Sequence, residues 1–472
     1  MDFDVIVVGG GGAGLAAAIT AAEAGASVLI VEWADHLGGT TELSGGVYMA
    51  AGTAAQIERG FAGDTVDAFF DYFMTFNRWH TDAATTKRFC DRALPTMQWL
   101  IAHGVSFPAE GLFRAGLEPV PRSHCPLGGG KAIVGALSAA AGRLGVDVAL
   151  GKRVSGLKVA AGRVCGVQAN GEEVTGASVI VTTGGFSQNF DLVRQHFPDA
   201  RMGGDNLWAP GAATNQGDGL TLGEQVGAAT AGRNHGDLLL SAGLIDQLEP
   251  QIPGWLVLVN QEGRRFVDEL APYNVITPLT MANGGSCWAV FDDDACRTAG
   301  GVRAGSWGAG TWTADMLAAG VTTGQVLRAP TVGELAGLMQ VPPAVLQSTF
   351  DRYNADCQAK IDSKFFKDAT AMRSIEKAPF YAVKLRPSVV AVTGYGLRID
   401  ADARVMGAAD DHPIPGLYAA GEATGNVLGP QYLGGGHAIG SALIFGRIAA
   451  ETAIADTHAM SSSLNMSSSL ND

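Results

Sequence analysis

The sequence predicts an α/β fold in which a dinucleotide-binding, Rossmann-like domain is interrupted by an α+β capping domain. Two observations carry this prediction. A glycine fingerprint, residues 9–14, lies between a strand pattern and a helix pattern near one end of the chain, and a second glycine-rich segment, residues 434–436, precedes a helix near the other end. Both segments suit a cofactor site in a parallel sheet, so the chain between them must leave this fold and return to it.

The first strand, turn and helix form a dinucleotide fingerprint in its required context. Residues 5–8 are Val-Ile-Val-Val, which is typical of a buried parallel strand, and a helix-forming run follows over residues 15–24. Gly9 permits a tight turn, Gly11 lets the backbone approach a pyrophosphate, and Gly14 lets the helix pack closely on the strand. Helix N–H groups can then face the phosphates. The predicted cofactor-binding residues of this turn are Gly9, Gly11, Gly12, Ala13 and Gly14.

The remaining glycine segments indicate FAD rather than NAD. A strand over residues 27–31 ends at Glu32, whose carboxylate can accept a hydrogen bond from a ribose hydroxyl and would repel a 2′-phosphate. Small residues over 38–46 allow the backbone to lie against a flat ring system. Another strand ends in Gly-Glu at 421–422, where a ribityl contact is expected, and the amides that start the helix at 443 can stabilise a reduced flavin. These segments add Gly39, Thr40, Thr41, Ser44, Gly45, Gly46, Gly421, Glu422, Ser441, Ala442 and Leu443.

Several motifs in a fixed order resemble the flavoprotein family that contains soluble fumarate reductases and 3-ketosteroid dehydrogenases. Besides the glycine segments they are Gly184-Gly185, Gly217-Asp218-Gly219, residues 263–269 and residues 291–293, so that the resemblance covers nearly the whole chain from residue 4 to about 455. It implies that Gly185 and Asp218 also contact FAD. It further implies that the inserted segment is a cap, which excludes water from a reduced flavin. FAD is expected to be noncovalent, because residues 39–41 contain no histidine.

The domain boundaries follow from this organisation. We predict the first part of the FAD domain over residues 1–234, the capping domain over 235–378 and the second part of the FAD domain over 379–456. A low-complexity duplication of Met-Ser-Ser-Ser-Leu-Asn predicts a disordered tail over 457–472.

Composition excludes several classes of partner. The 472 residues carry a formal net charge of -14, which argues against nucleic acid or an anionic membrane surface. Apolar runs are too short for a membrane span, and the chain starts directly with a strand pattern, so a cytoplasmic location is expected. The six cysteines never show CxxC spacing, and no metal site is predicted.

The resemblance also supplies candidate catalytic residues. Tyr432 occupies the position of an arginine that clamps a carboxylate in fumarate reductases, and residues 389–394 lack their carboxylate-binding histidine. Ketosteroid dehydrogenases carry a tyrosine followed four residues later by glycine, as Tyr432 and Gly436 do here. This match implies an oxyanion hole for a ketone oxygen. Tyr273 matches their catalytic tyrosine and is the predicted base, which requires a lowered pKa, for instance from a nearby Arg265 or Arg297.

Further candidates have two interpretations each. Tyr395 replaces a glycine of the relatives, so its ring either projects towards flavin or substrate, as a fourth catalytic candidate, or packs in the core. Arg122 and His124 either hold a substrate carboxylate or belong to a surface loop. Arg297 lies where either branch of the family carries a basic residue, and His437 contacts flavin or substrate or caps the backbone.

We therefore predict an FAD-dependent ketone dehydrogenase. It would introduce a C=C bond α,β to the carbonyl of a cyclic ketone, by proton abstraction and hydride transfer to flavin N5. The substrate would be a 3-ketosteroid or a smaller ring, such as a cyclohexanone bearing a carboxylate, and the Arg122/His124 pair favours the smaller ring. Oxygen, a quinone or a soluble carrier would accept the electrons. The alternatives are a fumarate-reductase-like enzyme that reduces an α,β-unsaturated carboxylate, and a non-catalytic flavin electron carrier.

Overall fold

The computed structural model describes residues 1–244, 252–299 and 312–469, with side chains described up to residue 460. The chain divides into two compact units. The first comprises residues 1–199, 209–237 and 391–472, and the second comprises residues 200–208 and 238–390. The predicted arrangement, an α/β cofactor fold interrupted by a second α+β unit, is confirmed in its fold class.

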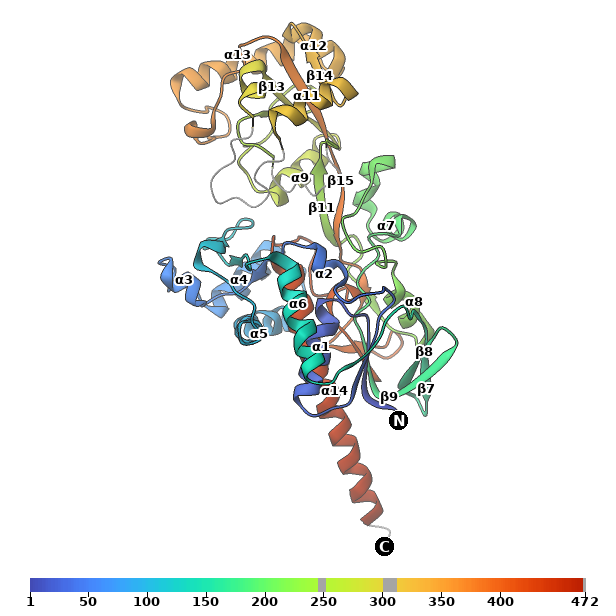
Figure 1. Ribbon diagram of the computed structural model, residues 1–472. Coiled ribbons are helices and arrows are strands. Elements are labelled where there is room, and N and C mark those ends of the chain that lie inside the picture. Colours follow the sequence, from blue (N-terminus) through green and yellow to red (C-terminus); the bar gives the residue numbers. More distant parts are fainter. Residues whose placement is uncertain (245–251, 300–311, 470–472) are drawn as a thin grey trace. The chain divides into compact units, whose positions relative to one another are not determined.

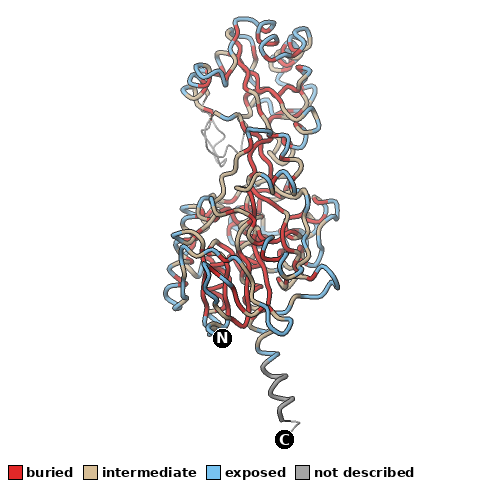
Figure 2. The backbone as a smooth tube through the Cα atoms, turned by 90° about the vertical axis from the view of Figure 1, so that its right-hand side faces the viewer, coloured by how far each residue is buried: buried red, intermediate tan, exposed pale blue. Residues whose placement is uncertain are grey.

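A mostly parallel sheet organises the first unit. Its order is β17 (Arg404–Met406), β18 (Pro413–Ala419), β9 (Glu172–Val181), β1 (Phe3–Val8), β2 (Val28–Val31) and β6 (Asp147–Ala149). Strand β1 runs parallel to both neighbours, with Val5 opposite Val28 of β2 and Ser178 of β9. The predicted excursion between β6 and β9 is a hairpin, β7 (Val154–Ala160) and β8 (Arg163–Ala169), whose second strand pairs with β9. Strand β2 is buried throughout, as a parallel strand covered on both faces must be. Figure 2 shows buried backbone, in red, close to the N-terminus.

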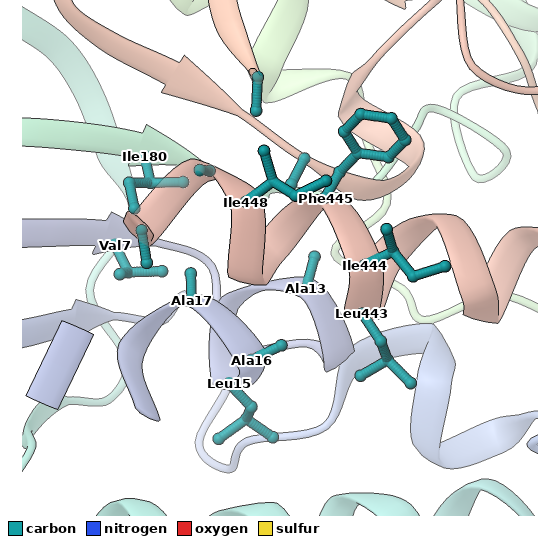
Figure 3. Packing of buried hydrophobic residues seen from close by; sticks show 14 of the residues in the cluster. Val7, Ala13, Leu15, Ala16, Ala17, Ile180, Leu443, Ile444, Phe445 and Ile448 are labelled. Carbon is teal, nitrogen blue, oxygen red and sulfur yellow. The ribbon is translucent and has the colours of Figure 1, made fainter. Parts of the chain in front are cut away.

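Two helices from opposite ends of the chain pack together on this sheet. They are α1 (Gly12–Glu23) and α14 (His437–Ser469), coloured blue and red in Figure 1. Small residues allow the close approach, because a Cβ on Gly446 would lie 2.3 Å from the carbonyl oxygen of Ala13. Figure 3 shows Leu443 and Phe445 among the apolar side chains of this interface. The packing brings the two glycine segments, 9–14 and 434–436, into one unit, as the sequence predicted.

Shorter elements complete the first unit. The predicted helical stretch 65–104 is two helices, α4 (Val66–Phe76) and α5 (Ala83–Ala102), separated by a turn in which Arg78 and Trp79 have positive φ. A small antiparallel sheet has the order β3 (Tyr48–Met49), β5 (Ser123–His124), β4 (Leu112–Phe113). The other elements are α2 (Gly39–Leu43), α3 (Ala54–Glu58), α6 (Gly129–Arg143), α7 (Phe190–His196), α8 (Asp218–Gln225), β10 (Thr230–Ala231) and β16 (Gly396–Leu397).

The second unit is built on an antiparallel sheet of order β11 (Gly236–Ser241), β15 (Phe380–Thr393), β13 (Cys287–Asp292), β12 (Val257–Val259), with β14 (Val326–Ala329) also paired to β15. Its helices are α9 (Tyr273–Ala282), α10 (Asp293–Arg297), α11 (Ala314–Thr323), α12 (Val332–Met339) and α13 (Pro343–Ala359). Buried apolar side chains on both faces of β13, such as Phe291 and Val290, form the cores on either side of this sheet.

Two predicted boundaries differ from the structure. The return to the first unit falls at Ala391 rather than at residue 379, because β15 is one continuous strand that pairs with β13 up to Leu385 before it reaches the first unit. The segment predicted as a disordered tail is instead the continuation of α14 to Ser469.

Helix α14 also tests the predicted lack of a membrane span. Its part from His437 to Met460 is long and apolar enough to cross a membrane by length and composition alone. However, 61% of that apolar window is buried inside the protein, as expected for the core helix that packs on α1.

Candidate functional site

The predicted cofactor residues follow parallel strands of the main sheet. The glycine turn follows β1, Glu32 follows β2, Gly185 follows β9 and Gly421 follows β18. Because these strands are parallel, their carboxyl ends lie along one edge of the sheet, where ligands of such folds bind.

The glycines of the turn differ in the space around them: a side chain would clash at Gly9 and Gly14 but not at Gly11. A Cβ on Gly9, which has a φ of 103°, would lie 2.5 Å from the carbonyl oxygen of Thr182, and a Cβ on Gly14 would lie 1.9 Å from that of Gly9. At Gly11 the nearest atom would be 3.8 Å away, so the space above it is open. Helix α1 begins without a side-chain cap, which leaves first-turn N–H groups such as that of Ala13 available to an anion.

Glu32 is buried and fixes the turn. Its Oε2 accepts a hydrogen bond from the Gly10 N–H at 2.6 Å, and its Oε1 accepts one from the Ala34 N–H at 2.7 Å. Each oxygen keeps a second lone pair. The contact of Glu32 with the ribose therefore stays a prediction. The structure adds a second role, in which Glu32 holds the phosphate-binding turn.

The hydroxyl groups after Gly38 also bind within the protein. Thr41 Oγ1 accepts a hydrogen bond from the Gly12 N–H at 3.2 Å, and Thr40 Oγ1 accepts one from the Ala212 N–H at 3.1 Å. Ser44 Oγ donates to the Thr41 carbonyl at 2.7 Å. These bonds hold α2 beside the glycine turn, and the predicted contacts of Thr40, Thr41 and Ser44 with the cofactor stay predictions.

A polar cluster beyond β9 and β18 contains groups that lack partners. Glu422 Oε1 accepts hydrogen bonds from both the N–H and the hydroxyl of Thr393, and a Cβ on Gly185 would lie 2.0 Å from that hydroxyl. Burial raises the pKa of Glu422, although these hydrogen bonds oppose the rise. Among the described residues, the buried Asn215 Oδ1 and Ser441 Oγ have no hydrogen-bond partner. Together with the open space above Gly11, these orphaned atoms fit the polar chain and ring edge of FAD.

Asp218 has a protein partner that the sequence did not reveal. Its carboxylate receives two hydrogen bonds from Arg153, at 2.9 Å from Nε and 2.7 Å from Nη2. The guanidinium of Arg153 lies 4.0 Å from the ring centroid of Trp33, the residue after Glu32. The structure therefore supports Asp218 as a residue that positions Arg153, and its direct contact with FAD stays a prediction.

Tyr432, Gly436 and His437 lie together at the start of α14. The Tyr432 Oη accepts a hydrogen bond from the Ala438 N–H at 3.2 Å, and its ring stacks on His437 with centroids 5.6 Å apart. Gly436 has a φ of 107°, and a Cβ there would lie 2.8 Å from the backbone nitrogen of Met49. The phenolic proton of Tyr432 stays available for a further acceptor, because its oxygen is the acceptor in the bond to Ala438.

His437 is buried between aromatic rings. Phe73 and Phe89 meet it edge-on at centroid distances of 4.8 and 5.4 Å. Burial lowers the pKa of His437 to about 3, while the nearby backbone of Val427 acts against this change. Neither ring nitrogen forms a hydrogen bond of ordinary geometry with the described residues. His437 is therefore a neutral ring, stacked on Tyr432, whose nitrogens lack hydrogen-bond partners among the described residues. This is compatible with its predicted flavin or substrate contact.

The sequence analysis missed Asp237, an acidic residue of the same site. It is the second residue of β11, is 8% exposed, and burial raises its pKa to about 7. Burial also raises the pKa of Tyr432, and the negative charge of Asp237 raises it further. The sequence does place this acid directly before the apolar run Leu-Leu-Leu. That position indicates burial, and a buried carboxylate is rare enough to mark a candidate functional residue.

Arg122 and His124 were predicted to bind substrate or to belong to a surface loop. Both are buried and bonded within the protein, so the surface loop is ruled out and their contact with substrate stays a prediction. Arg122 is buried and forms a bidentate pair with Asp64, at 2.9 and 2.6 Å, beneath the ring of Phe69. His124 is buried in β5, where its Nε2 lies 2.8 Å from the hydroxyl of Thr53, the N-cap of α3. Both side chains hold β5 in the core. A sequence motif alone cannot distinguish such a structural role from a position in the wall of a pocket.

Tyr395, predicted as a fourth catalytic candidate, packs against other residues of the first unit. Its ring stacks on His196, with centroids 4.1 Å apart and planes 8° from parallel, and its hydroxyl lies 2.7 Å from that of Thr230. These contacts favour the alternative interpretation, in which Tyr395 is a packing residue.

The remaining candidates belong to the second unit. Tyr273 is the first residue of α9 and is half-buried. Both arginines named as its activating cation already form ion pairs. Arg265 is buried between Glu269 and Asp362, and Arg297 pairs with Asp293 at 3.0 Å. The role of Tyr273 as base stays a prediction, and the structure offers no support for its activation by Arg265.

Comparisons with known proteins support FAD as the cofactor. The model of the FAD binding domain family matches residues 4–439. The chain is 30% identical over 465 residues to an NADH:fumarate oxidoreductase of Klebsiella pneumoniae, covering 96% of this chain and 47% of that protein. It therefore spans about half the length of that relative.

Two further relatives are matched over nearly their whole length. A 4-oxocyclohexanecarboxylate 2-dehydrogenase of Sinomonas cyclohexanicum is 28% identical over 95% of this chain and 92% of its own. The crystal structure of a 3-ketosteroid-Δ4-(5α)-dehydrogenase from Rhodococcus jostii RHA1 superposes with a TM-score of 0.80, at 27% identity and 96% coverage of both chains.

Proposed function

Since the chain belongs to the FAD binding domain family, we propose that it is an FAD-dependent dehydrogenase that introduces a C=C bond α,β to the carbonyl of a cyclic ketone. FAD is its cofactor. When bound, FAD supplies a two-electron acceptor for the hydride that leaves the β-carbon. An external acceptor, such as oxygen, a quinone or a soluble carrier, would then reoxidise it.

The observation that carries the proposal is the arrangement of Tyr432. The Ala438 N–H donates to the phenolic oxygen, so the phenolic proton is available for another acceptor. A ketone oxygen is a suitable acceptor, because it gains negative charge when the neighbouring carbon loses a proton. Donors already in place for this charge stabilise the transition state more than the ground state.

Gly436 would supply the second donor of this oxyanion hole. Its positive φ and the absence of space for a Cβ fix the backbone there, close to Met49. Ser123 Oγ donates to the Gly435 carbonyl at 2.7 Å, which further holds the segment. Tyr273, in the second unit, is the proposed base that removes the α-proton. Its role rests on the sequence match alone.

The size of the ring stays open. The preference for a small ring bearing a carboxylate depended on Arg122 and His124, and both are committed to the core. The two relatives matched over nearly their whole length are named for a cyclohexanone carboxylate and for a steroid. We therefore propose a cyclic ketone of either kind.

A second candidate is the reduction of an α,β-unsaturated carboxylate, which the name of the Klebsiella relative favours. A carboxylate substrate needs a cation to hold it. In the described part of the chain, the charged residues that act on Tyr432 are Asp237 and Glu422, which are both acids. This electrostatic environment supports the ketone.

Anaerobic mixing separates the candidates. The oxidised holoenzyme should bleach on mixing with a saturated cyclic ketone and stay yellow with succinate. The dye-reduced enzyme should turn over fumarate slowly. Fast fumarate reduction without bleaching by any cyclic ketone would establish the reductase instead, and inactivity towards both classes would favour an electron carrier.

A further inference from the structure

Asp237 is a buried carboxyl group for which the described part of the chain supplies no partner. It is 8% exposed, and within the described residues it forms no hydrogen bond and no ion pair. Ionised carboxylates are buried only when a cation or hydrogen-bond donors compensate the lost hydration. Without such compensation the neutral acid is favoured, in agreement with its pKa of about 7.

The position of Asp237 in β11 directs it towards the Tyr432 site. A Cβ on the preceding Gly236 would lie 2.6 Å from the Val392 carbonyl and 2.7 Å from the ring of Phe197. Side chains alternate between the two faces of a strand, so Asp237 projects away from Phe197. On that other face its charge acts on Tyr432.

The titratable groups around this pair are acidic or neutral. Glu422 also raises the pKa of Tyr432, while burial lowers the pKa of His235 and of His437 and keeps both rings uncharged near neutral pH. The end of β15 that enters the first unit, Ala391–Thr393, carries no charge. Burial alone accounts for the pKa of Asp237, so no described cation neutralises it.

Resting on the proposed function, we propose that Asp237 is the specificity-determining residue of this site. In its neutral form it permits negative charge on a ketone oxygen held by Tyr432, and in its ionised form it repels that charge. By the same repulsion the ionised form disfavours substrates that place a carboxylate at Tyr432. Neutral carbonyl compounds are admitted in either form, and the developing enolate is favoured while Asp237 holds its proton.

Binding of 4-nitrophenol tests this proposal without turnover. Its anion resembles an enolate, and its affinity for the FAD-loaded enzyme can be measured by equilibrium dialysis from pH 6 to pH 9. After correction for the ionisation of the free phenol, wild-type affinity for the anion should fall as the pH rises through about 7. Asp237→Asn should remove this fall and bind the anion roughly ten- to a hundredfold more tightly than wild type at pH 8.5.

Three variants serve as controls. Asp237→Glu keeps the charge and should keep the fall in affinity, and Asp237→Ser provides a second neutral variant if Asp237→Asn loses FAD. Glu118→Gln removes another buried acid with a pKa of about 7, next to Ser123, and should leave the pH dependence intact. An unchanged pH dependence in both neutral Asp237 variants, or its loss in Glu118→Gln, would overturn the proposal.

The outcome is separable from the proposed function. Failure of every cyclic ketone to bleach the flavin would contradict the dehydrogenase assignment, whereas the binding of 4-nitrophenol requires no redox step. A loss of pH dependence in Asp237→Asn would then still support anion exclusion at Tyr432.

Discussion

The charge network around Arg265 in the second unit and the Tyr432 site in the first unit differ in whether their buried charges are paired. In the second unit, Arg265 donates to Glu269 at 2.8 and 2.9 Å and to Asp362 at 2.9 and 2.7 Å, and Lys367 lies 3.0 Å from Glu269. Every one of these charges has an opposite charge within reach. In the first unit, the buried Asp237 acts electrostatically on Tyr432 and has no partner among the residues that the structure describes.

The difference separates a structural role from a functional one. A paired network satisfies its own members, so it holds elements together and needs no ligand. An unpaired buried carboxyl, together with the orphaned His437 ring and Ser441 hydroxyl, destabilises the protein unless a ligand completes it. Arg122 with Asp64 shows that the first unit also contains a paired, structural charge.

Breaking the paired network should have the largest effect on stability. Arg265→Leu removes the ion-pair partner of Asp362 and leaves Glu269 paired with Lys367. Loss of one partner of a buried pair costs about 3–5 kcal/mol. We expect a corresponding drop in the free energy of unfolding of the second unit, measured by urea titration with tryptophan fluorescence.

Arg297→Leu is the matched control for this variant. Its side chain is 66% exposed and pairs with Asp293 within one helix, so its loss should change stability by at most about 0.5 kcal/mol. Equal effects of the two substitutions would contradict the distinction between paired core and surface charges.

Removal of the Tyr432 hydroxyl should reduce turnover without removing FAD. Tyr432→Phe loses one donor to the developing oxyanion, which typically reduces kcat by about 10²–10³-fold. Tyr395→Phe, whose ring packs on His196, should stay within a few-fold of wild type. Steady-state kinetics and the flavin-to-protein absorbance ratio measure both. A large loss in Tyr395→Phe with little change in Tyr432→Phe would reverse the two roles.

A smaller effect is expected from the pH dependence of stability. Burial lowers the pKa of His124 from 6.5 to about 4, so the unfolded chain takes up this proton first as the pH falls. His124 therefore reduces stability progressively below about pH 6.5, by about 2 kcal/mol at pH 5. The buried acids Glu118 and Asp237, with pKa values of about 7, act in the opposite direction in the same range.

The variant His124→Gln isolates the histidine contribution. The stability of this variant relative to wild type should rise between pH 7 and pH 4.5, measured by urea unfolding at each pH. A difference that is constant with pH would show that His124 titrates normally in the folded protein.

The glycine segments made the cofactor fold predictable, because Gly9 and Gly14 have local reasons to be glycine that sequence spacing alone reveals. Side-chain partners were not predictable. Arg122 was assigned to substrate because its partner, Asp64, is distant in sequence, and Asp237 was overlooked because its meaning depends on burial against Tyr432. Whether a charged side chain is structural or functional depends on partners distant in sequence and on burial. A local sequence motif contains neither kind of information.

The most direct test of the dehydrogenase assignment is the fate of two hydrogens in one turnover. A cyclic ketone deuterated at both the α- and the β-carbon is mixed anaerobically with the oxidised holoenzyme, and the product is analysed by mass spectrometry. The account predicts bleached flavin and an enone that has lost one deuterium from each of the two carbons. An unchanged ketone beside oxidised flavin, for steroid and small ring alike, would contradict it.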